Sequence, residues 1–137
     1  AVIFIDTGAL VARYLANDQH HVRAVKQWEE IEQGGLRCFT SNLVIAETLT
    51  LLGRRASNAF SAARARSFYA SKVLQIVRPT EADEFSAIWY FEKYADQKVS
   101  FVDAVSFALM RRLTLATAFT FDEHFQLAGF QTVPATA

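Results

Sequence analysis

The segment VIFIDTGALVARYL, residues 2–15, indicates the fold class of this chain most clearly. Its first four residues are all apolar, which is typical of a strand buried on both faces of a parallel sheet. Asp6 follows this run, and Leu10, Val11 and Tyr14 then recur at the spacing of one helix face. We therefore predict a buried strand, an acidic residue at its carboxyl end, and a helix.

Short apolar runs and helical patterns continue to alternate along the chain. The later predicted strands cover residues 37–40, 73–77, 116–121 and 131–133. The later predicted helices cover 20–33, 42–53 and 57–71, and two more begin after Thr80 and Ser100. Strands separated by helices pair in parallel through helical crossovers. We predict an α/β three-layer sandwich with a central, mostly parallel sheet of four to five strands, in one domain over residues 1–137.

Local patterns predict further details of these helices. Asn42 is expected to cap the helix that follows it, because Asn is a common N-cap residue. Val22 and the three residues Phe85, Ile88 and Trp89 are expected to face the core. Ser100 and Asp103 have the spacing of a capping box.

The composition bounds the class of protein. The 137 residues are 52% hydrophobic, with 14 basic and 14 acidic residues, so the chain is globular rather than disordered. No apolar run approaches the roughly 18 residues of a membrane span, and the first residues, AVIFID, lack the basic start of a signal peptide. The single cysteine, Cys38, favours a reducing environment, so we predict a cytoplasmic protein without a membrane partner.

Four acidic residues occupy positions where burying a carboxylate costs free energy unless the carboxylate has a partner. Asp6 and Asp122 each follow an apolar strand, and ligands of open α/β sheets bind beyond the carboxyl ends of the strands. Glu47 and Asp103 interrupt otherwise apolar helix surfaces. Carboxylates brought to one point repel each other unless a cation lies between them, and an all-oxygen set suits Mg²⁺ or Mn²⁺.

Each acid also has a structural interpretation. Asp6 could cap the first helix, Asp103 could be the acidic half of the Ser100 capping box, and Asp122 could begin a turn. Glu47 is the hardest to explain in this way, because a buried Glu is rarely unpaired. Two strand-end acids together with two helix acids favour a metal site over four separate structural roles.

Two other enzyme classes share part of this pattern. VIFIDTGA matches the apolar-Asp-Thr-Gly signature of aspartic proteases, but the following residues are helical in pattern and no second Asp-Thr-Gly occurs. Phosphatases with an Asp nucleophile would require a second Asp at position 8, which is Gly. The sequence disfavours both.

Four segments in order resemble the PIN domain, specifically the VapC-type toxins of prokaryotic toxin–antitoxin pairs. These segments are FIDTGALV, TSNLVIAETLTLL, SFVDAVSFALMRR and AFTFDEHF. The resemblance implies an Mg²⁺- or Mn²⁺-dependent endoribonuclease that forms a homodimer and is held inactive by a small antitoxin of VapB type. The alternatives are a PIN nuclease of RNA processing outside such pairs and a non-catalytic RNA-binding module.

The resemblance also implies roles for individual residues. Its acidic metal site, which is also the catalytic site, corresponds to Asp6, Glu47, Asp103 and Asp122. Supporting hydroxyl groups correspond to Thr7, Ser41 (or its neighbour Thr40), Ser100 and Thr120. His124 matches a recurrent His-Phe pair, and we interpret it as structural because Phe125 faces a core.

The neutral net charge conceals an uneven distribution. Residues 48–80 contain six basic residues and no acidic one. We predict that Arg54, Arg55, Arg64 and Arg66 contact RNA phosphates, since cations of this kind provide affinity without sequence choice. Two alternatives stay open, which are a solvated basic helix and a docking surface for an acidic antitoxin segment.

Overall fold

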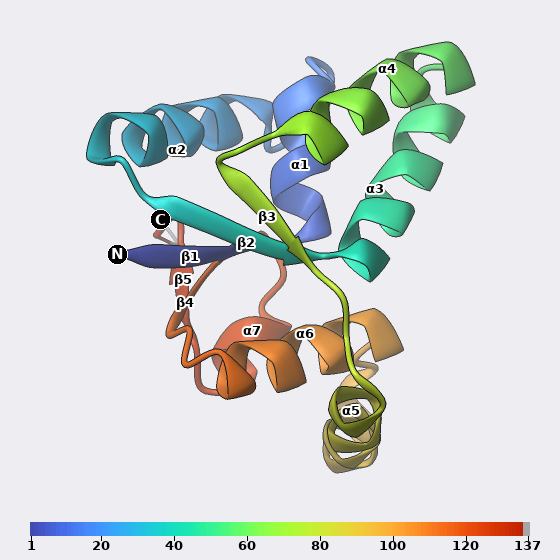
Figure 1. Ribbon diagram of the computed structural model, residues 1–137, viewed down its shortest axis with the longest axis vertical. Helices are drawn as coiled ribbons and strands as arrows, with labels where there is room; N and C mark the ends of the chain where they lie inside the picture. Colours follow the sequence, from blue (N-terminus) through green and yellow to red (C-terminus); the bar gives the residue numbers. More distant parts are fainter. Residues whose placement is uncertain (136–137) are drawn as a thin grey trace.

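Five parallel strands form one sheet in the computed structural model, which describes residues 1–135 (Figure 1). The strands lie in the order β3-β2-β1-β4-β5. Their bounds are β1 Val2–Ile5, β2 Arg37–Ser41, β3 Leu74–Val77, β4 Thr117–Phe119 and β5 Gln131–Val133. Each strand after β1 follows a helical connection, as parallel pairing requires.

Helices cover both faces of this sheet. One face carries α1 Thr7–Tyr14, α2 His21–Gly34, α3 Asn42–Arg55 and α4 Asn58–Ala70 (Figure 1). The other carries α5 Glu81–Lys93, α6 Phe101–Arg112 and the short α7 His124–Leu127, with a 3₁₀ turn at Ala95–Gln97. The predicted three-layer α/β class is therefore confirmed. Within the described residues, no helix is both long and apolar enough to span a membrane.

The order of the strands positions the functional site. The chain runs outward from β1 through β2 to β3, and it then returns to place β4 on the other side of β1. The connections that leave β1 and β4 enter α1 and α7, which lie on opposite faces of the sheet, and this divergence leaves a crevice at the carboxyl ends of the two strands. The Asp6 amide donates a hydrogen bond to the Phe119 carbonyl (3.0 Å) and ties the two strand ends together.

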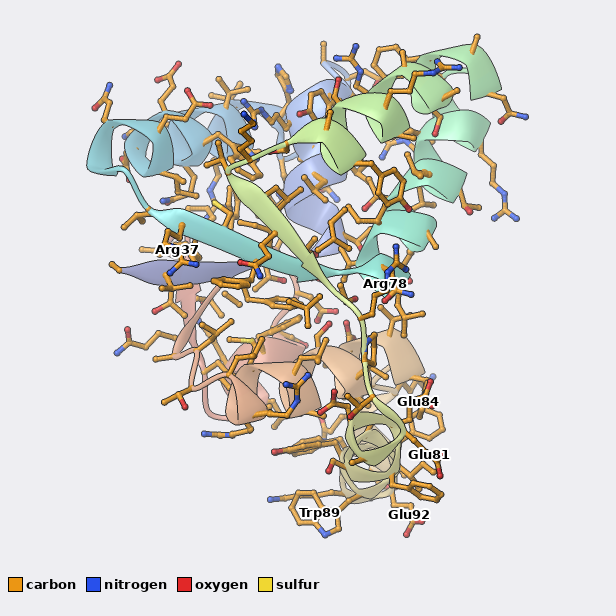
Figure 2. All side chains as sticks on the ribbon, viewed as in Figure 1. Arg37, Arg78, Glu81, Glu84, Trp89 and Glu92 are labelled. Atoms are coloured by element: carbon orange, nitrogen blue, oxygen red, sulfur yellow. The ribbon has the colours of Figure 1, made fainter. Side chains whose placement is uncertain are left out.

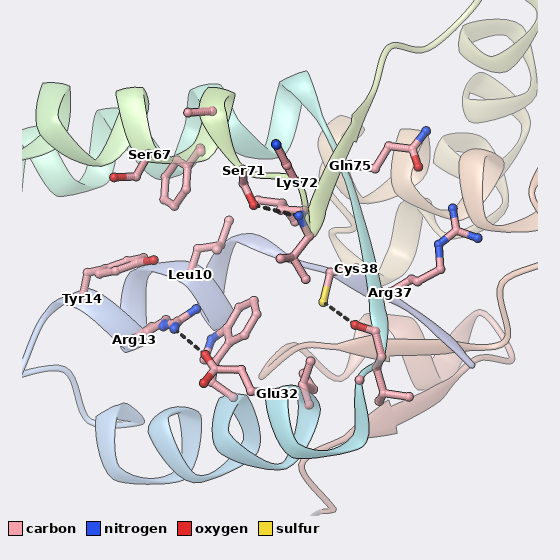
Figure 3. Close-up of a pocket in the computed structure, with 18 residues that line it drawn as sticks. Leu10, Arg13, Tyr14, Glu32, Arg37, Cys38, Ser67, Ser71, Lys72 and Gln75 are labelled. Carbon is pink, nitrogen blue, oxygen red and sulfur yellow. Dashed lines mark hydrogen bonds and ion pairs between the residues drawn. The ribbon is translucent and has the colours of Figure 1, made fainter.

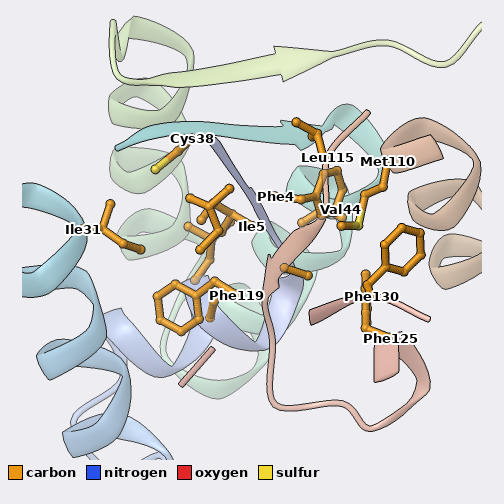
Figure 4. Packing of buried hydrophobic residues seen from close by; sticks show 14 of the residues in the cluster. Phe4, Ile5, Ile31, Cys38, Val44, Met110, Leu115, Phe119, Phe125 and Phe130 are labelled. Atoms are coloured by element: carbon orange, nitrogen blue, oxygen red, sulfur yellow. The ribbon is translucent and has the colours of Figure 1, made fainter. Parts of the chain in front are cut away.

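Aromatic side chains fill the space between the sheet and α6. Phe4, Phe107 and Phe125 are fully buried there, and Figure 4 shows Phe4 and Phe125. Phe119 is equally buried but lies on the opposite face of the sheet, where its ring centroid is 5.2 Å from that of Trp28 on α2. Phe107 and Phe125 meet edge to face with centroids 5.0 Å apart, an arrangement that aromatic pairs prefer. This packing fixes α6 and α7 on the sheet and so fixes the acidic residues that they carry.

The predictions that Asn42 caps a helix and that Val22 faces the core were wrong, because nearby residues have these roles. Ser41, not Asn42, caps α3, and its hydroxyl accepts a hydrogen bond from the Val44 amide (3.1 Å). Val22 is exposed, because α2 packs inward through Ala24, Trp28 and Ile31 instead.

The prediction that Phe85, Ile88 and Trp89 face inward was also wrong. All three are exposed, and Figure 2 shows Trp89 on the side of α5 that faces away from the sheet. The helix packs on α6 through the opposite face, which carries Ala87 and Tyr90. Both faces of α5 are apolar in sequence, so its periodicity alone did not distinguish them.

Candidate active site

A cavity of about 640 Å³ opens at the carboxyl ends of β1 and β4. All four predicted acids line it, although they come from four different elements of the chain. They are Asp6 after β1, Glu47 on α3, Asp103 on α6 and Asp122 after β4. Asp18 and Glu123, which the sequence analysis did not single out, line the same cavity. The role of the four predicted acids as metal ligands stays a prediction.

Asp6 is held by the neighbouring strand rather than by the helix it precedes. It occupies the N-cap position of α1, but its side chain makes no capping hydrogen bond. Instead, the Thr120 hydroxyl donates to Asp6 Oδ2 at 2.7 Å. Asp6 is buried, and its carboxylate has no basic side chain as a hydrogen-bond partner among residues 1–135. The alternative interpretation of Asp6 as a helix cap is thus not supported by this geometry.

Asp103, Asp122 and His124 form a close group beside Asp6. One ligand atom from each lies within 4.8 Å of the others. His124 Nδ1 is 3.1 Å from Asp122 Oδ1 and 3.4 Å from Asp103 Oδ2. The Ser100 hydroxyl caps α6 by accepting the Asp103 amide (3.0 Å), which leaves the Asp103 carboxylate directed at this group. The spacing predicted a reciprocal capping box, but only the Ser100 half of it forms.

His124 has a different environment from the one expected. Phe125 is fully buried as predicted, but successive side chains of a helix point in directions about 100° apart. The His124 ring consequently lies in the acidic cavity. A recurrent histidine two residues after a strand-end acid was the available signal, and we interpreted it as structural.

Two carboxyl groups of the cavity have raised pKa values. Burial, and next the charge of Asp103, raise the pKa of Asp6 to about 7 despite the hydrogen bond from Thr120. Burial, and next the charge of Asp122, raise the pKa of Asp103 to about 6 although His124 opposes the shift. Like charges in a desolvated site produce such shifts. A bound divalent cation would stabilise the ionised form of both carboxylates and so oppose both effects. This set of oxygen donors therefore fits a divalent cation.

Glu47 and Thr7 also line the cavity. Glu47 is partly exposed and approaches from α3. The Thr7 hydroxyl is buried in the same cavity and has no hydrogen-bond partner among residues 1–135. A buried hydroxyl without a partner is uncommon, and a ligand or water in the cavity would satisfy it.

The other predicted hydroxyl groups have distinct places. Thr120 links two of the acids, because its Oγ1 donates to Asp6 and accepts the Asp122 amide (3.0 Å). Ser100 lines the cavity as the cap of α6. Ser41 is fully buried as the cap of α3 and is not part of the cavity lining.

The predicted arginines separate into three environments. Arg55 lines the acidic cavity and donates to Asp18 at 2.8 Å. Arg64 packs over the rings of Tyr14 and Phe60. Arg54 and Arg66 are exposed, and neither contributes to the lining of the cavity.

A second and larger cavity, of about 800 Å³, lies near the amino ends of β2 and β3. It is bounded by α1, α2 and α4, and an ion pair between Arg13 and Glu32 (2.8 Å) spans part of it (Figure 3). None of the four predicted acids lines it. Size therefore does not identify the chemical site, whereas the convergence of carboxylates does.

Comparison with known proteins agrees with this geometry. A model of the PIN domain family matches residues 3–131. The chain belongs to the PIN domain family. The 23S rRNA-specific endonuclease VapC20 of Mycobacterium tuberculosis is 35% identical over 129 residues, which are 94% of this chain and 95% of that protein, in each of two strains. This PIN domain is therefore a nuclease of VapC type, as the four sequence segments predicted.

Two solved structures show the same architecture. The crystal structure of M. tuberculosis VapC20, described as a Sarcin-Ricin loop cleaving toxin, has a TM-score of 0.85 at 33% identity and covers 95% of this chain and 96% of its own. VapBC2 from Rickettsia felis, bound to a DNA fragment from its promoter, has a TM-score of 0.63 at 13% identity, with 96% and 97% covered. The second likeness concerns the fold alone.

Proposed function

We propose that this chain is a divalent-metal-dependent endoribonuclease and the toxin of a VapBC-type toxin–antitoxin pair. The observation that carries this proposal is the convergence of Asp6, Glu47, Asp103 and Asp122 on one cavity, where burial and neighbouring acids raise the pKa of Asp6 and Asp103. The 35% identity to an rRNA-specific endonuclease over nearly the whole chain supports RNA as the substrate.

Each acid would have a definite role in the site. Asp6 and Asp103 are the most buried of the four and would hold the main Mg²⁺ or Mn²⁺ ion. Asp122 and Glu47, which are more exposed, would bind a second ion or orient the attacking water. When bound, the metal lowers the pKa of water and offsets charge on the scissile phosphate. Thr120 fixes the positions of Asp6 and Asp122 relative to each other through its two hydrogen bonds.

Cleavage of RNA by the purified chain tests this proposal. We expect cleavage in Mg²⁺ or Mn²⁺, none in EDTA, and recovery when the metal is added back. Asp103→Asn should abolish cleavage, whereas the matched change Asp96→Asn, at an exposed acid outside the cavity, should not. If the folded parent protein binds RNA but cleaves it in neither Mg²⁺ nor Mn²⁺, the chain is instead a binding module.

A small antitoxin of VapB type is the proposed protein partner. The surface that supports this proposal is the segment 48–80, whose six basic residues and absence of acids would attract an acidic peptide. Co-expression with a small protein encoded beside this chain should yield a complex that no longer cleaves RNA. Cleavage at the parent rate by such a complex would contradict the assignment to a toxin–antitoxin pair.

We also propose that the chain forms a homodimer in the cytoplasm. Five large apolar side chains are exposed on α5 and the start of α6, a concentration that marks interaction surfaces. They are Phe85, Ile88, Trp89, Phe91 and Phe101. Light scattering should give twice the chain mass, and Trp89→Glu should give the monomer mass. An unchanged mass in that variant would exclude this face from the dimer.

The single buried cysteine, Cys38, is consistent with a reducing compartment.

A further inference from the structure

Three side chains beside the acidic cavity form a stack that the proposed metal site does not use. The rings of His20 and Phe121 are stacked with centroids 4.3 Å apart and planes 2° from parallel. Among the aromatic pairs of residues 1–135 this is both the closest and the most nearly parallel. The Arg23 guanidinium lies 5.5 Å from the centroid of the Phe121 ring.

One side of this stack belongs to the cavity itself. Phe121 lies in the chain between Thr120 and Asp122 and lines the cavity with the acids. Its ring rests over the first turn of α1, where a Cβ on Gly8 would be 3.6 Å from Phe121 Cδ2. The inner part of the stack is therefore supported by the same backbone that carries Asp6.

The other side is held by the loop between α1 and α2. The His20 amide donates to Asp18 Oδ1 at 2.8 Å, and Asp18 Oδ2 accepts from Arg55 at 2.8 Å. Asp18 and Arg55 line the acidic cavity as well. The position of the His20 ring is thus set at the rim of the site by two hydrogen bonds and one stacking contact.

The composition of this stack is unusual for a purely structural contact. His20 and Phe121 are only partly buried and Arg23 is exposed, so the stack lies at the surface and not in the core. Packing a loop requires apolar volume, whereas parallel aromatic rings with a guanidinium alongside are the planes on which proteins stack unpaired nucleobases.

We propose that His20 and Phe121 form a platform on which one unpaired nucleobase of the RNA stacks, next to the phosphodiester at the acidic site. The base would extend the stack from its solvent side at His20, and Arg23 would contact the flanking backbone. This inference rests on the proposed nuclease function. It adds a requirement that the acids do not impose, which is that a nucleotide beside the cleaved bond must be free of pairing.

Fluorescence of 2-aminopurine tests this platform without depending on cleavage. The base is placed in turn at each position around the cleavage site of an RNA that the parent protein cuts, and binding is measured with the Asp6→Asn protein, so that the RNA stays intact. We expect quenching on binding at one position. The quenching should disappear when His20→Ala or Phe121→Leu is added, and His20→Phe and Phe121→Tyr should restore it because they keep the rings.

Kinetics with the active protein provide a second measurement. Stacking of one base on an aromatic residue contributes about 1–3 kcal/mol, so Phe121→Leu should raise KM about 5- to 150-fold. An abasic nucleotide at the quenched position should raise the KM of the parent by a similar factor and should make the protein insensitive to Phe121→Leu. Val22→Ala, at an exposed apolar residue of α2 that does not line the cavity, serves as the control and should change neither KM nor quenching.

The outcomes separate this inference from the proposed function. If the chain neither binds nor cleaves RNA, the nuclease proposal fails and the platform fails with it. If the chain cleaves RNA but quenching and KM are unchanged in folded His20→Ala and Phe121→Leu, only the platform is wrong. Loss of quenching that the aromatic replacements do not restore would also overturn it, because the two rings would then act by holding the loop.

Discussion

Two buried aspartates of this molecule have opposite electrostatic surroundings. Asp83, at the start of α5, accepts two hydrogen bonds from Arg112 at 2.7 and 2.9 Å, and these hydrogen bonds hold the pKa of Asp83 below its ordinary value. Asp6 is buried to a similar extent, yet burial and neighbouring acids raise its pKa to about 7. Asp83 is neutralised by the protein itself, and Asp6 is not.

This difference distinguishes a structural carboxylate from a functional one. Burying an ionised group without a partner is costly, so proteins pair it or use it. The Asp83–Arg112 pair joins α5 to α6 and needs nothing further. The carboxylates at the ends of β1 and β4 stay in a state that a bound cation would stabilise, which is typical of functional sites.

Replacing each aspartate by asparagine should have the largest effect and should separate the functional role of Asp6 from the structural role of Asp83. Asp6→Asn should lower the rate of RNA cleavage by about 10³-fold, since it removes a ligand of the metal. Asp83→Asn should leave the rate unchanged below the melting temperature, but it should lower the free energy of unfolding by about 2 kcal/mol because Arg112 loses its charged partner. Cleavage assays and chemical denaturation measure the two effects. Similar losses of activity in both variants, with both folded, would remove the distinction.

The pH dependence of stability should differ in sign between the two aspartates. Because the pKa of Asp6 is raised in the folded state, the folded protein binds more protons than the unfolded chain from about pH 4 to pH 7. The metal-free protein should therefore lose stability as the pH rises across this range, by a few kcal/mol at most. Asp83 contributes stability that is lost only on acidification below about pH 4.

Thermal melts at pH 5 and pH 8 measure this effect in EDTA and in Mn²⁺. Asp6→Asn should make the metal-free protein more stable than the parent at pH 8, and Mn²⁺ should stabilise the parent more than the variant. A melting temperature of the metal-free parent that rises steadily from pH 5 to pH 8, with no difference from Asp6→Asn, would contradict the raised pKa.

Replacing Thr120 should lower metal affinity or activity, although its side chain is small. Thr120→Val removes the hydrogen bonds to Asp6 and Asp122 while keeping the shape of the side chain. Residues that orient metal ligands typically affect metal affinity or activity by about 10- to 100-fold, and we expect a loss in this range. Metal titration of cleavage measures it. Thr120→Ser should restore activity, and Thr117→Val on the same strand is a control outside the cavity.

The smallest expected effect concerns the arginines near the cavity. Arg55→Gln should weaken RNA binding a few-fold and reduce the slope of log affinity against log salt by about 0.7, the value for one single-strand phosphate contact. Arg54→Gln should do less, because Arg54 does not line the cavity. Filter binding over a range of salt concentrations compares them. Equal slopes for Arg55→Gln and the parent would place the RNA elsewhere.

The sequence predicted the strand-end acids well because local pattern and topology agree on them. An apolar run followed by Asp6 and another followed by Asp122 must lie at one edge of a parallel sheet, and β1 and β4 are neighbours. It predicted the direction of single side chains less well. The apolar residues on both faces of α5 concealed which face is exposed, and His124 was assigned from its neighbour Phe125.

The contact between His20 and Phe121 had no signal in the sequence. The two residues are far apart in the chain, and each is unremarkable in its own segment. Only the packing of α1 and β4 brings the two loops together, through the support of Gly8 and the hydrogen bonds of Asp18. Packing also distinguishes Arg55 from the other predicted arginines, since it alone of the four lines the cavity, where it donates to Asp18.

By itself, the sequence determined the alternation of strands and helices, the identity of the four acids, and the resemblance to PIN domains, because these depend on local order and spacing. Tertiary structure alone decided which groups partner each acid. Arg112 reaches Asp83, whereas Thr120 and His124 reach the acids of the cavity. Charge balance inside a protein depends on distances between segments that only packing brings together, and that balance makes Asp83 structural and the carboxylates of the cavity a candidate metal site.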